Sequence, residues 1–150
     1  MIRLKHLLQE ALTDTYTLYV DMGGVLFKKM GADAGGSGDA TEYIGETLWE
    51  KIKNLSPTIL SAIGNDSDGK KKDVKQDQVN KYLTPTPPIK FVTLGTDKKL
   101  YANENSILID DEQKNIDAWE SPGADGIGIL HKSNNVQDTI DQLKKYFDLD

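Results

Sequence analysis

Two short apolar runs, each ending in acidic residues, constrain this chain more than any other feature. Residues 18–27 read LYVDMGGVLF, in which a buried strand ends at Asp21 and a pair of glycines follows. Residues 106–111 read SILIDD, a second apolar strand that ends in a carboxylate pair. Such runs are typical of strands buried on both faces, and open α/β sheets bind ligands at the carboxyl ends of their strands. Three carboxylates at two strand ends therefore predict a site for a divalent cation such as Mg²⁺, which prefers oxygen ligands.

The rest of the chain alternates between short apolar strands and helical patterns. Strands are expected at residues 15–20, 58–63, 90–94, 106–109 and 126–130. Helices are expected at residues 3–12, from the capping pair Asp39 and Glu42 to residue 55, and at residues 73–83, 112–120 and 135–147. This alternation predicts one α/β domain over residues 1–150, with a mostly parallel five-stranded sheet and helices on both of its faces.

Two segments fall outside this alternation. Residues 28–40 contain four glycines and few apolar residues, so we expect either a flexible flap beside Asp21 or a simple linker. No Gly-Lys-Ser/Thr follows these glycines, which argues against a P-loop. The N-terminal helix, within residues 1–14, is expected to pack on the flank of the domain, with docking to a partner as the alternative.

A lysine run and a histidine outside the acidic strand ends are weaker indications of function. The run Lys70-Lys71-Lys72 is expected in a polar, solvated loop over residues 64–72, with Asp73 capping the helix that follows. His131 follows the last strand, and we expect a solvated loop residue there, with a site residue as the alternative.

Composition excludes several classes of function. The net charge of −6 and a pI of about 4.9 argue against binding to a nucleic-acid polymer through bulk charge. The absence of cysteine excludes disulfides, thiolate nucleophiles and zinc–thiolate sites. No apolar run approaches the ~18–20 residues that span a bilayer, and residues 1–12 lack the apolar core of a signal peptide. We therefore expect a cytoplasmic protein that binds no membrane.

With these motifs placed in order, the chain resembles the haloacid dehalogenase superfamily. Within it, the chain looks most like the small nucleotidase-like phosphatases, including those common in bacteriophages. The likeness covers about residues 17–143 and depends on four motifs in the family's order. The motifs are residues 20–26, residues 58–62, Lys98 or Lys99 before residues 100–102, and residues 107–116.

The resemblance implies a three-layer, Rossmann-like fold with a minimal cap, whose place residues 28–40 would take. It also implies a Mg²⁺-dependent phosphohydrolase that acts on a small phosphomonoester, such as a nucleoside monophosphate. Asp21 would be the nucleophile and form an aspartyl-phosphate. The Mg²⁺ would be held by Asp21, the backbone carbonyl of Gly23 and Asp110, with Asp111 as a ligand either directly or through water.

The same resemblance implies a phosphate-binding set. The phosphoryl group would lie against Gly23, Gly24, Ser61 and Ala62. Ser61 would hydrogen-bond the phosphoryl oxygens, and either Lys98 or Lys99 would offset the charge on nucleophile and phosphate. The sequence leaves the choice between the two lysines open.

Position 23 departs from the family's pattern. Phosphatases of the superfamily place a second Asp there as general acid and base, a role worth ~10²–10⁴-fold in rate. With Gly23, turnover is expected to be slow or the aspartyl-phosphate to persist, unless a flap residue such as Asp33 or Asp39 supplies the proton. The alternative is a catalytically inactive relative that binds a phosphate or nucleotide, or acts as an interaction protein. A phosphorelay receiver is disfavoured, because receivers carry the acidic pair after the first strand.

Overall fold

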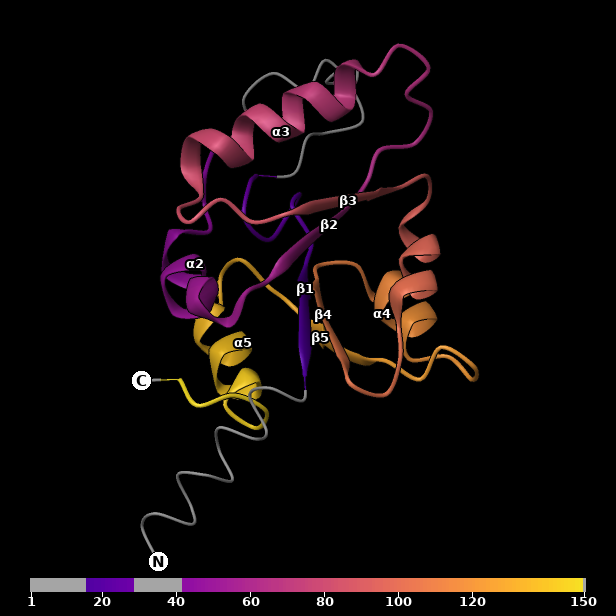
Figure 1. Cartoon of the computed structure of the whole chain (residues 1–150). Helices are drawn as coiled ribbons and strands as arrows, with labels where there is room; N and C mark the ends of the chain where they lie inside the picture. The colour runs from indigo at the N-terminus through magenta and orange to yellow at the C-terminus, as the bar shows by residue number, and fades with distance from the viewer. Residues whose placement is uncertain (1–15, 29–41, 150) are drawn as a thin grey trace, which may run out of the picture.

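The sheet has five parallel strands in the order β3-β2-β1-β4-β5, seen in a computed structural model that describes residues 16–28 and 42–149 (Figure 1). All four neighbouring pairs are parallel. The strands are β1 (Thr17–Val20), β2 (Thr58–Ala62), β3 (Ile89–Val92), β4 (Ser106–Asp110) and β5 (Ile127–Leu130). The predicted α/β class is therefore confirmed, and the predicted strands are confirmed to within two residues at each end.

Helical segments connect the strands, because parallel strands need crossover connections. They are α2 (Glu46–Ile52) with the 3₁₀ turn η1 (Lys53–Leu55), α3 (Lys70–Tyr82), the 3₁₀ helix η2 (Gly95–Tyr101), α4 (Gln113–Trp119) and α5 (Val136–Leu143). The expected N-terminal helix and nearly all of the expected flap lie outside the described residues. No helix in the described ranges is long and apolar enough to cross a membrane.

Alternation along the strands divides the core between the two faces of the sheet. Leu18 and Val20 of β1 pack with the face that α2 and α5 cover, whereas Tyr19 between them packs with α4 on the other face. The first cluster also contains Ile59, Ile107, Ile109 and Ile129, and the second contains Leu60, Leu108, Ile116 and Trp119. Strands covered on both faces are expected to read as continuous apolar runs, which is why these runs were visible in the sequence.

The predicted start of the second helix was wrong. Helix α2 begins at Glu46, not near Glu42, because the backbone before it pairs with the loop after β1. The Lys28 amide donates to the Glu42 carbonyl at 2.8 Å, and Phe27 forms an antiparallel bridge with Tyr43. The proposed capping residue Asp39 lies outside the described residues.

The start of α3 was also predicted wrongly. The lysine run is the first turn of this helix, not a loop, and Asp73 lies inside the helix. The Asp66 carboxylate accepts hydrogen bonds from the backbone amides of Lys71 and Lys72, at 3.0 and 3.2 Å. A carboxylate at this position satisfies amides that have no partner within the helix and offsets the helix dipole.

His131 is buried, contrary to the expectation of a solvated residue. Its side chain is 2 % exposed, and its Nδ1 lies 2.7 Å from the Thr139 hydroxyl of α5. Burial lowers the pKa of His131 below its usual value. The helix α5 itself ends at Leu143, earlier than predicted, while Phe147 still packs into the core.

Replacing Gly126 by Ala is expected to destabilise the protein by about 1–3 kcal/mol. An added Cβ would overlap the indole of Trp119, whose Nε1 donates to the Ser106 carbonyl at 3.1 Å. Gly23→Ala is the matched control, because a Cβ there meets no described atom within 4 Å. Urea denaturation of both variants measures the difference, and equal free energies of unfolding would contradict this packing.

Candidate functional site

The three predicted carboxylates converge at the carboxyl edge of the two central strands. The backbone amide of Asp21 donates to the Ile109 carbonyl at 2.9 Å, so the pairing of β1 with β4 extends to the ends of both strands. Asp21 and Asp110 therefore lie side by side at this edge. Asp21, Asp110 and Asp111 each offer a carboxylate oxygen, and these atoms lie within 4.8 Å of one another. Three carboxylates at this spacing are a donor set that can bind a metal ion.

Gly24 makes room for one of these carboxylates. Its φ of 83° is a left-handed conformation that favours glycine. A Cβ at this position would overlap the carboxylate of Asp111. Any side chain at position 24 would therefore push Asp111 away from the other two acids.

Lys98 is the lysine that the fold brings to the acids. Its side chain is 1 % exposed, and its Nζ lies 2.9 Å from Asp21 Oδ1 and 2.7 Å from Asp110 Oδ2. Burial alone would lower the pKa of Lys98, but the two carboxylates outweigh it and the pKa is raised. Lys99, the next residue of η2, is exposed. Of the two lysines that the sequence left open, Lys98 is therefore the one that lies at the carboxylates.

Negative charge at the site is only partly offset by Lys98. Burial raises the pKa of Asp21 to about 7, with Lys98 opposing the shift and Asp110 and Asp111 adding to it. Without a further cation, a proton on Asp21 relieves the repulsion. A divalent cation would serve the same purpose, so the residues present fit such an ion.

Helix α4 and η2 hold the Asp110 carboxylate in place. Its Oδ1 accepts from the backbone amide of Glu112 at 3.0 Å, and its Oδ2 accepts from Asn115 Nδ2 at 3.2 Å. The Asn115 amide packs against the backbone of Gly95, where a Cβ would overlap it. Asp110 is consequently fixed by hydrogen bonds on both oxygens.

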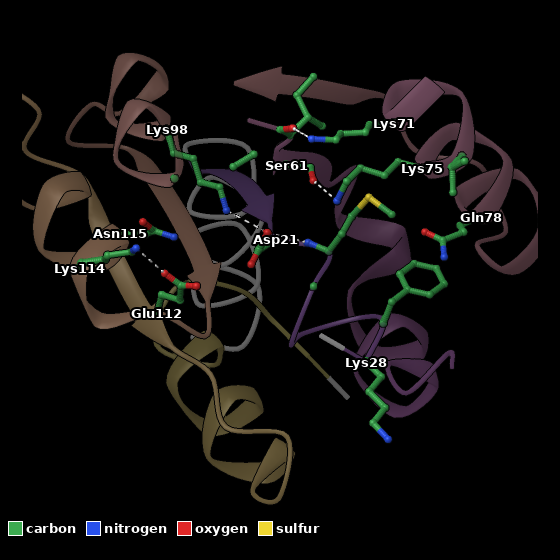
Figure 2. A pocket seen from close by; sticks show the side chains of 17 residues that line it. Asp21, Lys28, Ser61, Lys71, Lys75, Gln78, Lys98, Glu112, Lys114 and Asn115 are labelled. Carbon is green, nitrogen blue, oxygen red and sulfur yellow. Dashed lines mark hydrogen bonds and ion pairs between the residues drawn. The ribbon is translucent and has the colours of Figure 1, made fainter. Parts of the chain in front are cut away.

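A cavity of about 410 Å³ opens beside Asp21 (Figure 2). The predicted residues that line it are Asp21, Gly23, Ser61, Ala62 and Lys98. From the opposite side, α3 contributes Lys71, Val74, Lys75 and Gln78. Ser61 is buried at the end of β2, and its Oγ accepts a hydrogen bond from Lys75 Nζ at 2.9 Å. The fold therefore brings Ser61 into the same cavity as Asp21.

Sequence reasoning missed Lys75 and gave Asn115 no role. Lys71, Lys75 and Gln78 are spaced i, i+4 and i+7, which places them on one face of a helix. The spacing is hidden because the lysine run predicts a solvated loop over residues 64–72, which places Lys71 outside the expected helix. Asn115 follows the acidic pair by one turn of α4, a spacing that can return a side chain to the strand end.

The arrangement combines a buried carboxylate, the buried Lys98, the partly buried Lys75 and a hydroxyl around one cavity, which is a set suited to binding an anion near a cation. No protein-family model matches this chain, and no curated protein sequence matches it either. What the site can do therefore follows from its own residues.

The metal-free protein is expected to lose stability as pH rises from about 4 to about 7. Burial raises the pKa of Asp21 from 3.8 to about 7, so between these values the folded chain holds a proton that the unfolded chain has released. This stabilising contribution is complete below pH 3.8 and is lost as pH rises through 7.

Asp21→Asn removes this titration. Urea denaturation in the presence of a chelator, at steps from pH 4 to pH 8, should show the native protein losing stability relative to the variant. A difference between the two free energies of unfolding that does not vary with pH would show that Asp21 titrates normally.

Proposed function

We propose that this chain is a Mg²⁺-dependent phosphohydrolase of the haloacid dehalogenase type, which acts on a small phosphomonoester through an aspartyl-phosphate on Asp21. The observation that carries the proposal is the Lys98 ammonium between Asp21 and Asp110, beside a cavity that Ser61 also lines. The order of these groups along the sequence is the order that the superfamily resemblance implies. A cavity of about 410 Å³ suits a small-molecule substrate, of which a nucleoside monophosphate is one example.

Asp21 is placed to act as the nucleophile. Its Oδ1 accepts from the Met22 amide at 2.9 Å and from Lys98, which fixes the carboxylate plane. Its Oδ2 accepts no hydrogen bond from the described part of the chain, so this oxygen is available to attack phosphorus. The attack forms a bond from Oδ2 to phosphorus and breaks the ester P–O bond, and the leaving oxygen takes up a proton from water. Water then hydrolyses the aspartyl-phosphate, releases phosphate and regenerates Asp21.

The acidic cluster would hold the metal ion. Asp21, Asp110 and Asp111 would supply carboxylate oxygens, and the resemblance adds the backbone carbonyl of Gly23. When bound, Mg²⁺ would offset the negative charge of these carboxylates and of the phosphoryl group. Lys98 would stay between Asp21 and Asp110 and orient both of them.

Hydrolysis of the aspartyl-phosphate is the expected slow step. Among the described residues that line the cavity, the acids are Asp21 and Glu112, and Glu112 is paired with Lys114 at 3.3 Å. Position 23, where the superfamily's phosphatases carry their acid, has only a hydrogen for a side chain. The phosphorylated protein is therefore expected to accumulate.

The second candidate function is a catalytically inactive relative that binds a phosphate or nucleotide, or interacts with another protein. Gly23 is the observation that favours it, because this residue removes the general acid while the other groups of the site remain. The two candidates share the metal and anion chemistry and differ in whether Asp21 becomes phosphorylated.

Mg²⁺ is expected to raise the melting temperature of the native protein. A ligand that binds only the folded state stabilises it by about 2.7 kcal/mol at 100 times its Kd. Asp110→Asn should abolish the Mg²⁺-dependent shift, because it removes one of the three carboxylates. Asp125→Asn, an exposed change of the same kind, should retain the shift. If Asp110→Asn also retained the shift, Mg²⁺ would bind elsewhere than at the three carboxylates.

Gly23→Asp is expected to increase phosphate release by roughly 10²–10⁴-fold. The backbone there is not left-handed, and a Cβ meets no described atom within 4 Å, so an Asp side chain fits. The assay measures release from an aryl phosphate and from a panel of nucleoside monophosphates with Mg²⁺. Gly23→Asn is the matched control, of the same shape without the acid.

Asp21→Asn should abolish both phosphate release and covalent labelling of the protein. Activity that survives in Asp21→Asn would contradict the role of Asp21 as nucleophile. Equal rates in Gly23→Asp and Gly23→Asn would contradict the assignment of the missing acid to position 23. Silence from every variant would favour the inactive relative.

A further inference from the structure

Helix α3 brings a second lysine, Lys75, to the cavity. This lysine is partly buried and comes from a different element than Lys98. Lys75 lies on the face of α3 that lines the cavity, and its Nζ donates to Ser61 Oγ at 2.9 Å. Figure 2 shows Lys75 and Ser61 pointing toward each other on the side of the cavity opposite Lys98, with Asp21 between the two lysines. A ligand bound at Asp21 would therefore have Lys98 on one side and Lys75 on the other.

The other lysines of the cavity either have partners or point away from Asp21. Lys98 pairs with two carboxylates, and Lys114 pairs with Glu112. Lys71 donates to the backbone carbonyls of Ile63 and Asn65, at 3.3 and 2.9 Å. Lys28 is exposed, and its ammonium points away from Asp21 in Figure 2.

Lys75 differs because its contact is with a neutral hydroxyl. Within the described ranges, no carboxylate forms an ion pair with its ammonium, whose hydrogen bond goes to Ser61. Burial lowers the pKa of Lys75, and the more distant charge of Asp21 only partly opposes this effect. A cation withdrawn from water without a counterion gains strongly from a bound anion.

The hydrogen bond between Lys75 and Ser61 also fixes the direction of free donors. An ammonium has three N–H donors, of which Ser61 takes one. Since the Ser61 oxygen accepts from Lys75, its own O–H is left to donate elsewhere, and no described residue accepts it. The pair thus offers one O–H and up to two N–H donors, a number suited to the oxygens of a tetrahedral anion.

We propose that Lys75 is a substrate-binding residue for the phosphoryl group and forms an anion-binding pair with Ser61, to which the superfamily resemblance already assigns such a contact. This inference deepens the proposed function and depends on it for the identity of the ligand. It divides the work between two lysines: Lys98 holds the carboxylates together, and Lys75 binds the phosphoryl oxygens.

The test is the affinity of the full-length protein for inorganic phosphate with Mg²⁺, measured by calorimetry. Lys75→Gln should weaken phosphate binding by roughly 10- to 100-fold, which is the usual contribution of a hydrogen bond to a charged group. Ser61→Ala should weaken it less, because Lys75 retains its charge. Lys70→Gln, an exposed change of the same charge on the same helix, should alter the affinity less than about twofold.

A second readout separates binding from structural damage. The Mg²⁺-dependent rise in melting temperature should persist in Lys75→Gln, since the three carboxylates are unchanged. Phosphate affinity in Lys75→Gln equal to that of the native protein would overturn the proposal. Parallel loss of the Mg²⁺ response and of phosphate binding would also overturn it, because Lys75 would then act on the structure of the site.

Failure of this inference can be told apart from failure of the proposed function. Phosphate binding that depends on Lys75, in a protein whose Asp21 never becomes phosphorylated, would support the anion-binding pair and refute the hydrolase. Turnover by Lys75→Gln with an unchanged KM would refute the pair and support the hydrolase.

Discussion

The buried ammonium of Lys98 is the interaction on which the rest of the site depends. It joins Asp21 at the end of β1 to Asp110 at the end of β4, and it comes from η2, which precedes β4 in the chain. Buried charges are costly unless they are paired and hydrogen-bonded. Breaking a buried pair typically costs about 3–5 kcal/mol, because the remaining charge has no partner. Lys98 therefore ties the packing of three elements to the electrostatics of one cavity.

The topology of the sheet explains why the site forms at this place. Strand β1 is central. Helix α3, which follows β2, packs in the core cluster on one face of the sheet, and α4, which follows β4, packs in the cluster on the other face. In open α/β sheets this arrangement leaves a crevice at the carboxyl ends of the strands, where ligands bind. Here α3 closes one side of the crevice with Lys75, and η2 and α4 close the other with Lys98 and Asn115. Gly24 and Gly95 supply the room that Asp111 and Asn115 need.

The features predictable from the sequence are those encoded in local patterns. The strand ends carrying Asp21, Ser61 and Asp110 follow from apolar runs with polar residues at their ends, because parallel strands align these ends at one edge. Which of Lys98 and Lys99 reaches the site depends on how the 3₁₀ helix η2 is rotated about its axis. No periodic pattern of apolar residues in the sequence of η2 indicates that rotation. The role of Lys75 depended on α3 starting at Lys70, and that start is stabilised by Asp66, across a polar loop. The burial of His131 required its contact with Thr139, eight residues away.

The most direct test of the site is a crystal structure of the protein grown with Mn²⁺ and beryllium fluoride, a mimic of a phosphoryl group attached to a carboxylate. We expect an anomalous peak among Asp21, Asp110 and Asp111, and the mimic bonded to Asp21 with Lys75 and Ser61 at its fluorines. Mn²⁺ bound away from these carboxylates, or a mimic that leaves Asp21 unmodified at saturating concentration, would contradict the proposal that Asp21 is the phosphorylated residue of a metal-dependent site.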